Sequence, residues 1–213
     1  MKPYAAVIFD MDGVIVDSEP LHVRAFEEIF AELGHADHGL HFPDYFGRSD
    51  KVVWLDFIER HRPPHSLEHL THIKEQRYLD LLNGTRPIYP GVEELLRDLA
   101  RATRLGLASG SVHTMIEAVL SLRGLRPLFG AVSSSQDVPH PKPAPDVFLH
   151  AASLLKVDPA DCVVIEDSAA GVAAARAAGM QVIAITNSLP AERLKAADQV
   201  VQSYAEVRRL LLH

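Results

Sequence analysis

Short apolar segments recur along the chain, and sequences with helical patterns separate most of them. The segments that we expect to form strands span residues 5–9, 105–109, 131–133, 163–165, 182–186 and 199–201. Strands that alternate with helices are typical of an α/β protein, in which helices cover a mainly parallel sheet. The sequence therefore predicts an α/β core with three layers.

The first two of these segments are unusually far apart. About ninety residues separate them, which is too many for a simple crossover between parallel strands. Within the gap, apolar residues at helical spacing predict helices over residues 20–33 and 66–82. The stretch between these two helices is broken by Pro43, Gly47, Pro63 and Pro64. A small helical domain is therefore expected to interrupt the α/β pattern.

The inserted helical domain, which we call the cap, is expected to span residues 16–84. Asn83-Gly84 is a turn signal that marks the return to the core, and a helical pattern over residues 91–102 restarts the alternation. Residues 1–15 and 85–213 would then form a Rossmann-like α/β core with a mainly parallel sheet.

Composition is that of an ordinary globular protein, with 47% hydrophobic and 23% charged residues. The formal charge of −7 argues against a nucleic-acid partner, and no apolar run approaches the roughly 20 residues of a membrane helix. Cys162 is the only cysteine, and no signal-peptide pattern is seen, so we expect a cytoplasmic location. Cys162 itself is expected to be a small buried hydrophobe.

Two carboxylates follow the first apolar segment. Asp10 and Asp12 stand where ligands bind in open α/β sheets, just beyond the carboxyl end of a strand. Their mutual repulsion must be offset by a cation or by hydrogen-bond donors, and Mg²⁺ is the natural partner for oxygen ligands. Gly13 allows a tight turn directly after the pair. The same residues also suit a solvated turn.

A second polar segment, Ser109-Gly110-Ser111, follows the next apolar segment and precedes a helical pattern. The Ser109 hydroxyl and the backbone amides around Gly110 would form an anion site, because the amides at a helix start are unpaired and the helix dipole favours negative charge. The alternative is that Ser109 caps the helix and Gly110 is a flexible neighbour.

Lys142 lies in a proline-rich segment that ends at Asp146. Pro143 suits the first turn of a helix running towards Leu155, which would place the Lys142 ammonium beside the positive end of that helix. Such a placement is unfavourable unless an anion lies between them. A solvated proline-rich turn is the alternative.

Two further acids, Glu166 and Asp167, end another strand-like segment before a helix that closes at Gly179. Asp167 or Ser168 could simply cap this helix. However, neighbouring strand ends lie about 5 Å apart in a sheet, so these acids and the Asp10 pair could form one carboxylate cluster. Such a cluster would suit a divalent cation.

In this order, the motifs resemble those of the haloacid dehalogenase-like hydrolases. The resemblance is to the phosphatase and β-phosphoglucomutase-like branch, which has a small helical cap. It covers nearly the whole chain and is carried by Asp10, Asp12, Gly13, Val14, Asp17, Ser18, Ser109, Lys142, Glu166 and Asp167.

The resemblance implies that Asp10 is a nucleophile that forms an aspartyl-phosphate. Asp12 would protonate the leaving oxygen and later activate water. Ser109 and Lys142 would hold the phosphoryl group. The implied Mg²⁺ ligands are Asp10, the backbone carbonyl of Asp12, Glu166 and Asp167.

The resemblance also implies that the cap supplies substrate specificity. His22 could meet Asp12 or the substrate when the cap closes, or could be a partly exposed helical residue. Lys74 lies where mutase-like members carry a lysine, although a solvated position is the simpler interpretation. Arg48 is a second candidate for substrate binding. Asp50 occupies the position at which the mutases carry arginine, which weakens the mutase interpretation.

Eight of the twelve histidines lie in the cap. Four of them have spacings that could share a helix face and hold a second metal: His61, His65, His69 and His72. Pro63 and Pro64 interrupt that helix, so a hydrated surface is the favoured interpretation.

The sequence thus leads to a Mg²⁺-dependent phosphatase that acts on a small phosphorylated metabolite, such as a sugar or polyol phosphate. The closest alternative is a β-phosphoglucomutase, in which a sugar hydroxyl accepts the phosphoryl group in place of water. A non-catalytic sugar-phosphate-binding protein is the alternative of another class, since fold does not determine function. No essential acid is missing, nor is the lysine.

Overall fold

Six strands form one parallel sheet in the computed structural model, which describes residues 4–45 and 50–212. The strands are β1 (Ala6–Phe9), β2 (Arg104–Ala108), β3 (Ala131–Ser133), β4 (Cys162–Glu166), β5 (Gln181–Ile185) and β6 (Gln199–Val201). Their order across the sheet is β3-β2-β1-β4-β5-β6, and every neighbouring pair is parallel. The predicted α/β fold class is confirmed.

The order of the strands places a topological switch between β1 and β4. From β1 the chain proceeds outward to β2 and β3, and it then returns to the other side of β1 with β4. Phe9, the last residue of β1, pairs with Leu107 on one side and with Ile165 on the other. The residues that follow β1 and β4 therefore emerge side by side, where ligands bind in this class of sheet.

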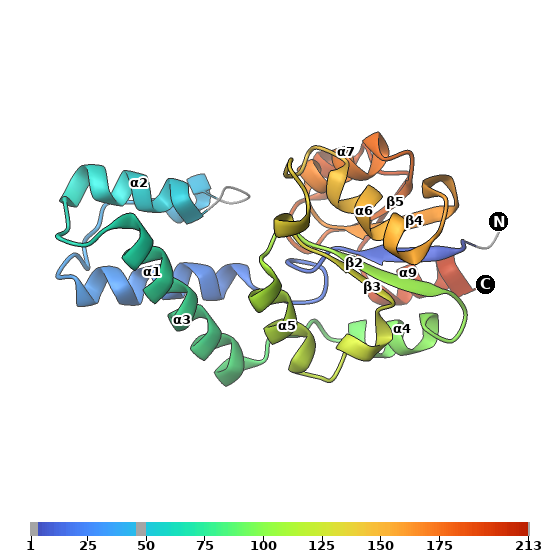
Figure 1. Ribbon diagram of the computed structural model, residues 1–213, viewed down its shortest axis with the longest axis horizontal. Coiled ribbons are helices and arrows are strands. Elements are labelled where there is room, and N and C mark those ends of the chain that lie inside the picture. Colours follow the sequence, from blue (N-terminus) through green and yellow to red (C-terminus); the bar gives the residue numbers. More distant parts are fainter. Residues whose placement is uncertain (1–3, 46–49, 213) are drawn as a thin grey trace. The chain divides into compact units, whose positions relative to one another are not determined.

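Helices cover both faces of the sheet (Figure 1). The helices outside the expected cap are α4 (Val92–Leu99), α5 (His113–Ser121), α6 (Asp146–Leu155), α7 (Ala169–Ala177), α8 (Ala191–Leu194) and α9 (Tyr204–Leu212). Helices α6 and α7 pack on one face, and α4 and α9 contact each other on the other face. This is the predicted three-layer, Rossmann-like arrangement.

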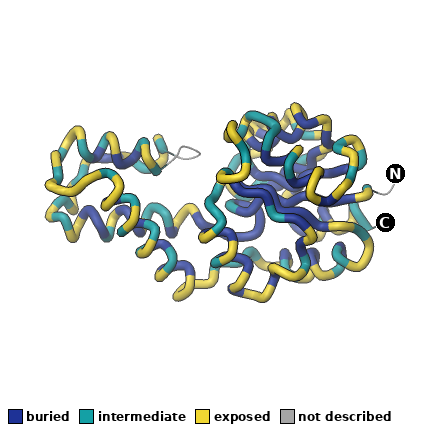
Figure 2. Tube along the Cα trace, viewed as in Figure 1, coloured by how far each residue is buried: buried dark blue, intermediate teal, exposed yellow. Residues whose placement is uncertain are grey.

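The strands are buried from both sides, as the dark sheet in Figure 2 shows. Every residue of β1 and of β4 is buried. A strand covered on two faces gains from apolar residues at every position, which is why these strands appear in the sequence as continuous apolar runs. Cys162 is fully buried within this core, as predicted, and burial raises the pKa of its thiol to about 11.

The chain divides into two compact units. One unit is Met1–Asp17 with Ile88–His213, which we call the core, and the other is Ser18–Pro87, the cap. The cap contains α1 (Glu19–Glu32), α2 (Asp50–His61), α3 (Leu67–Thr85) and a short 3-10 turn at Phe42–Tyr45. None of the helices described is long and apolar enough to cross a membrane.

Aromatic side chains fill the interior of the cap. Phe30 stacks on Phe57 with their ring centroids 4.0 Å apart, and Trp54 contacts both Phe26 and Phe30 edge to face. Leu70, from α3, completes the same apolar cluster. Aromatic pairs of this kind add about 0.5–1.5 kcal/mol each beyond the apolar area that they bury. The small cap therefore has a core of its own.

Two local expectations for the cap were wrong. The stretch expected to be broken contains α2, because Pro43 and Pro63 lie outside the helix, which buries Trp54 and Phe57 on one side. Helix α3 also continues through the turn signal Asn83-Gly84, because burial of its last apolar turn outweighs the turn preference of that dipeptide.

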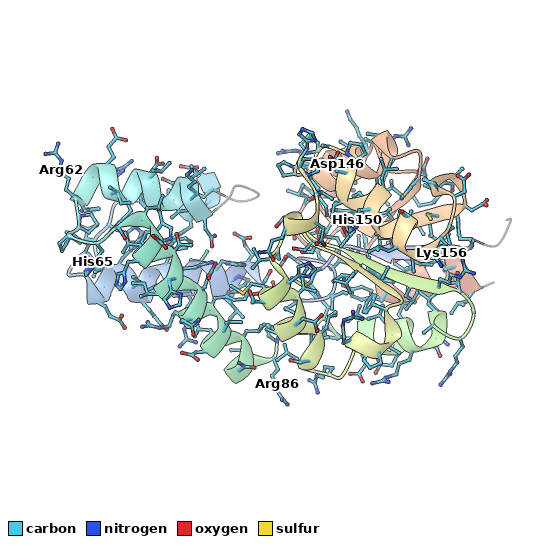
Figure 3. All side chains as sticks on the ribbon, viewed as in Figure 1. Arg62, His65, Arg86, Asp146, His150 and Lys156 are labelled. Carbon is cyan, nitrogen blue, oxygen red and sulfur yellow. The ribbon has the colours of Figure 1, made fainter. Side chains whose placement is uncertain are left out.

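Three helices end at a basic residue with a left-handed backbone. Arg62, Arg86 and Lys156 have φ angles of 46°, 51° and 56° and follow α2, α3 and α6 (Figure 3). Each backbone N–H donates to a carbonyl in the last turn of its helix. A cation at a helix C-terminus also interacts favourably with the helix dipole. These residues take the place that glycine usually fills at a helix end.

Candidate active site

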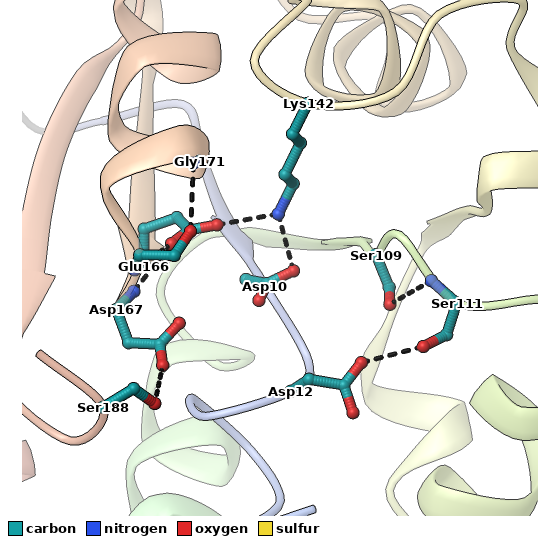
Figure 4. A network of polar contacts seen from close by, with 10 residues as sticks. Asp10, Asp12, Ser109, Ser111, Lys142, Glu166, Asp167, Gly171 and Ser188 are labelled. Carbon is teal, nitrogen blue, oxygen red and sulfur yellow. Dashed lines mark hydrogen bonds and ion pairs between the residues drawn. The ribbon is translucent and has the colours of Figure 1, made fainter. Parts of the chain in front are cut away.

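Three carboxylates meet at the carboxyl ends of β1 and β4. Asp10 follows β1, Glu166 is the last residue of β4, and Asp167 comes next. The backbone N–H of Asp10 donates to the carbonyl of Ile165 at 3.0 Å, which joins the two strand ends. Oxygen atoms of the three carboxylates all lie within 4.8 Å of one another, and all three residues are buried (Figure 4). The acids at the two strand ends thus form the expected cluster with Asp10, but the Asp12 carboxylate is not part of the group.

The ammonium group of Lys142 lies against this cluster. Lys142 Nζ donates to Asp10 Oδ1 and to Glu166 Oε1, each at 2.7 Å, and the side chain is only 13% exposed. The same nitrogen lies 4.7 Å from the centroid of the Phe148 ring. Charged hydrogen bonds of this length in a buried setting are strong, so Lys142 fixes the positions of both carboxylates.

The local structure around Lys142 differs from the expectation. Helix α6 begins at Asp146 and not at Pro143. A proline disfavours the α conformation in the residue before it, so the helix starts only after the last proline of the segment, Pro145. The anions that the Lys142 ammonium contacts in this structure are the carboxylates of Asp10 and Glu166.

Burial and mutual repulsion dominate the electrostatics of the cluster. Burial raises the pKa of Asp10 well above its usual range, and Lys142 opposes this rise while Glu166 adds to it. Burial, followed by the Glu166 carboxylate, raises the pKa of Asp167 to about 7. Burial disfavours the charged form of Lys142, but the Asp10 and Glu166 carboxylates outweigh it and raise its pKa. Burial and neighbouring carboxylates therefore disfavour the charged forms of Asp10 and Asp167.

Two glycines leave the space that two of these carboxylates occupy. A Cβ atom on Gly171 would lie 1.6 Å from Glu166 Oε1, and one on Gly13 would lie 1.8 Å from Asp167 Oδ2. Gly13 also has a φ angle of +75°, which favours glycine. Ser188 donates a hydrogen bond to Asp167 from the other side. Glycine is therefore needed at both positions, because any larger residue would displace a carboxylate of the cluster.

The side chains of Glu166 and Ser168 accept hydrogen bonds from different backbone N–H groups at the start of α7. The Glu166 Oε2 atom accepts from the backbone N–H groups of Asp167 at 2.7 Å and Ser168 at 2.6 Å. Ser168 caps α7 by accepting from the N–H of Gly171 at 3.0 Å. Of the two residues considered as caps, Ser168 has this role, and the Asp167 side chain instead joins the carboxylate cluster.

Serines from the loop after β2 approach Asp12. Ser109 is fully buried, and its Oγ accepts from the N–H of Ser111 at 3.0 Å. The Ser111 hydroxyl donates to Asp12 Oδ2 at 2.8 Å (Figure 4). Helix α5 begins only at His113, with Val112 at the N-cap position, so the alternative in which Ser109 caps that helix was wrong. The bond to Ser111 holds Ser109 in a turn before the helix.

The loop after Asp12 is held by residues from the far end of the chain. The Asn187 side-chain amide donates to the carbonyl of Gly13 at 2.7 Å and to the Tyr204 hydroxyl at 2.9 Å. The Tyr204 hydroxyl donates to the carbonyl of Val14 at 2.5 Å. The turn that directs the chain away from Asp10 and Asp12 is therefore fixed by two side chains.

Lys74, in the cap, is fully buried, and the solvated interpretation was wrong. Its ammonium lies 2.5 Å from Asp50 Oδ2 and also bonds His22 Nδ1. The rings of Phe26 and Tyr78 lie 5.0 and 5.4 Å from it. A paired charge surrounded by aromatic rings can remain buried, which helical periodicity alone does not indicate.

The remaining cap candidates are in different situations. Arg48 lies outside the residues that the structure describes. His61 is on α2, where it bonds the carbonyl of His38 at 2.9 Å, so it does not share a helix with His69 or with His72. Among the described residues, the carboxylates of the core are the only group of side chains placed to hold a metal ion.

Four residues of these networks were not predicted to have a role: Ser188, Asn187, Tyr204 and Gly171. Ser111 was noted only as part of a loop motif. Each of them acts through a partner that is distant in the sequence or through an absent side chain. Only the position of Ser111, two residues after Ser109, provided a local signal.

A family model of haloacid dehalogenase-like hydrolases matches residues 4–179. The chain belongs to the haloacid dehalogenase-like hydrolases. It is 39% identical over 183 residues to hexitol phosphatase B of Escherichia coli (strain K12), covering 84% of this chain and 82% of that protein. It is 33% identical over 188 residues to the fructose-1-phosphate phosphatase YqaB of the same strain, covering 84% and 95%.

Solved structures agree with this membership. The crystal structure of β-phosphoglucomutase from Clostridium difficile is similar, with a TM-score of 0.79 and 27% sequence identity, and the match covers 98% of this chain and 95% of that one. The predicted resemblance to the phosphatase and β-phosphoglucomutase-like branch of the haloacid dehalogenase-like hydrolases is thereby confirmed, and the chain is an enzyme of that family.

Proposed function

We propose that the protein is a Mg²⁺-dependent phosphatase that hydrolyses a sugar or polyol monophosphate through an aspartyl-phosphate. The observation that carries this proposal is the buried carboxylate cluster at the switch between β1 and β4, where Lys142 binds the Asp10 carboxylate at 2.7 Å. The names of the relatives support the substrate class, since they are a hexitol phosphatase and a fructose-1-phosphate phosphatase.

In the first step, a carboxylate oxygen of Asp10 attacks phosphorus and forms a new P–O bond. The bond from phosphorus to the sugar oxygen breaks, and the proton of the Asp12 carboxyl passes to that leaving oxygen. Lys142, which donates to Oδ1 of Asp10, orients the nucleophile and offers positive charge to the phosphoryl oxygens. Ser109 would supply a further contact to the phosphoryl group.

In the second step, a water molecule attacks the phosphorus of the aspartyl-phosphate. Asp12 accepts a proton from the water, the acyl phosphate bond breaks, and inorganic phosphate leaves with Asp10 restored as a carboxylate. The same residue thus acts first as an acid and then as a base, which is the usual pattern when one carboxyl serves both halves of a covalent mechanism.

The donor set of the site fits Mg²⁺. Three carboxylates, Asp10, Glu166 and Asp167, converge with Lys142 as their cationic neighbour, and hard cations prefer oxygen ligands of this kind. The pKa of Asp167, raised by burial and by Glu166, indicates charge that a cation would stabilise. Bound Mg²⁺ would neutralise charge on the carboxylates and on the phosphoryl oxygens.

An ion pair in the cap supports water as the acceptor. A mutase must hold a bisphosphate, whose second phosphate needs a cationic clamp. The Lys74 ammonium is fully buried and is paired with Asp50 at 2.5 Å, so its charge is already compensated within the cap. A single phosphate, held by the core, therefore suits the chain better.

The variant Asp10→Asn tests the proposed nucleophile. The substitution conserves volume but removes the attacking oxygen, so phosphate release from hexitol and hexose monophosphates should fall by at least about 10³-fold, or about 4 kcal/mol in the barrier. Circular dichroism should be unchanged. Activity within tenfold of the parent would exclude Asp10 as the nucleophile. Tight binding of a sugar phosphate without turnover by the parent would instead favour the non-catalytic alternative.

A paired assay tests the acceptor. Phosphate release and glucose 6-phosphate formation should be followed together on β-glucose 1-phosphate, with and without glucose 1,6-bisphosphate. We expect phosphate release and little isomerisation under both conditions. Rapid isomerisation with negligible phosphate release would identify a β-phosphoglucomutase, with Lys74 or Arg48 as the expected clamp in the cap.

A further inference from the structure

The Ser111 hydroxyl connects two loops of the candidate site. Asp12 belongs to the loop after β1, whereas Ser111 belongs to the loop after the neighbouring strand β2. The hydroxyl donates to Asp12 Oδ2 at 2.8 Å, although the two residues are 99 positions apart in the sequence. A bond of this length to a carboxylate is charge-assisted and strongly directional.

Ser111 is itself held by its backbone on both sides. Its N–H donates to the Oγ atom of Ser109 at 3.0 Å, and its carbonyl accepts from the Ser134 hydroxyl at 2.8 Å. Ser109 and Ser134 are both fully buried. The backbone of Ser134 is fixed in turn, because its N–H donates to Asp137 Oδ2 at 2.8 Å. The position from which the Ser111 hydroxyl can donate is therefore set by the core and not by a mobile loop.

Asp12 needs such a support for geometric reasons. It is only partly buried, and the hydrogen bond from Ser111 restricts the orientation of its carboxyl group. Proton transfer to a leaving oxygen requires the carboxyl group within about 2.6–3.2 Å of that oxygen and correctly oriented. A displacement of about 1 Å can cost on the order of 10²-fold in rate.

We propose that Ser111 is a positioning residue, whose hydroxyl fixes the orientation of the Asp12 carboxyl group for proton transfer. This inference rests on the proposed function, in which Asp12 is the general acid and base. Ser111 has no covalent part in the reaction. Its contribution should be greatest when the leaving oxygen needs a proton, and smallest when the leaving group departs as a stable anion.

The variant Ser111→Ala should be compared on two substrates. On a hexitol or hexose monophosphate, whose alkoxide leaving group needs a proton, kcat should fall by about 10- to 100-fold, while KM should stay within about threefold. On 2,4-dinitrophenyl phosphate, the single-turnover release of dinitrophenolate should stay within about threefold of the parent. Ser111→Thr, which retains the hydroxyl, should recover most of the lost kcat.

Two further variants complete the test. Ser121→Ala removes a hydroxyl that bonds only within α5, to the carbonyl of Ala118 at 2.8 Å, and serves as the matched control. Asp12→Asn tests the acid role of Asp12 separately from the positioning role of Ser111. If Asp12→Asn retains the parent rate on the sugar phosphate, the proposed acid role of Asp12 fails. If Asp12→Asn is inactive and Ser111→Ala matches the parent, or loses equally on both substrates, the positioning role of Ser111 alone is refuted.

Discussion

Replacing Gly171 with alanine should disrupt the carboxylate cluster without changing any of its functional groups. Gly171 lies in the first turn of α7, and the added methyl group would lie 1.6 Å from Oε1 and 2.6 Å from Oε2 of Glu166. Neither oxygen can stay where it is, because real contacts of a Cβ atom are longer than 3.0 Å. The Glu166 carboxylate must therefore leave its position.

The size of the effect follows from the bonds that hold Glu166. Its carboxylate accepts from Lys142 at 2.7 Å, from the N–H of Asp167 at 2.7 Å and from the N–H of Ser168 at 2.6 Å. Hydrogen bonds to a charged group contribute about 1.5–3 kcal/mol each, so losing two of them costs about 3–6 kcal/mol. Alanine favours the helix by only about 1 kcal/mol. We expect a net loss of about 2–5 kcal/mol in the free energy of unfolding.

The measurements are urea unfolding in chelator, Mg²⁺ titration by calorimetry, and phosphate release. Gly171→Ala should lower all three quantities: stability, affinity and activity. The matched control is Gly84→Ala, because Gly84 lies in the last turn of α3 and an added Cβ meets nothing within 4 Å. That variant should be equal to the parent or up to about 1 kcal/mol more stable. Parental stability and Mg²⁺ affinity in Gly171→Ala would refute the close approach of Glu166.

Three further outcomes are expected. Activity should vanish in chelator and return with Mg²⁺, while Ca²⁺ should inhibit because it takes more ligands at longer distances; full activity after verified metal removal would contradict this. Mg²⁺ affinity should weaken as the pH falls below about 7, because the proton that Asp167 holds below its raised pKa competes with the metal; a constant affinity from pH 5.5 to 8.5 would argue against it. In chelator, Lys142→Met should lower the free energy of unfolding by about 3–5 kcal/mol at pH 8, since it leaves the Asp10 and Glu166 carboxylates without their cation. That loss should shrink at pH 5.5, where protonation of Asp10, whose charged form is disfavoured by burial, removes part of the repulsion; equal losses at both pH values would contradict the reasoning.

The parts of the site that could be predicted are those encoded locally. Asp10 directly follows one buried strand and Glu166 ends another, and a parallel sheet brings such strand ends together whatever the rest of the chain does. The bond between Ser111 and Asp12, by contrast, joins residues 99 positions apart. The pairing of this hydroxyl with this carboxylate depends on the geometry of two loops. The periodicity of the sequence does not predict it.

In the cap, too, locally encoded features were predicted and contacts between distant residues were not. Helix α1 was predicted because its apolar residues repeat at helical spacing, but α2 lies in a stretch that its flanking prolines made appear broken. The burial of Lys74 depends on Asp50, which lies 24 positions earlier in the sequence and on another helix. Sequence reasoning about a lone lysine assumes water around it, and only the tertiary structure supplies a partner.

The central place of β1 in the sheet has a consequence for the synthesis of the protein. Val7 pairs with Leu105 on one side and with Val163 on the other, so both neighbours of this strand are made long after it. At roughly 5–20 residues per second, a ribosome needs about ten to thirty seconds to reach β4 from β1. Throughout that interval an apolar strand that carries the candidate nucleophile at its end has an unpaired edge, which is the kind of segment that aggregates or recruits chaperones. The strand β1, at the centre of the candidate active site, is thus also the strand for which the interval between its own synthesis and that of its last neighbour is longest.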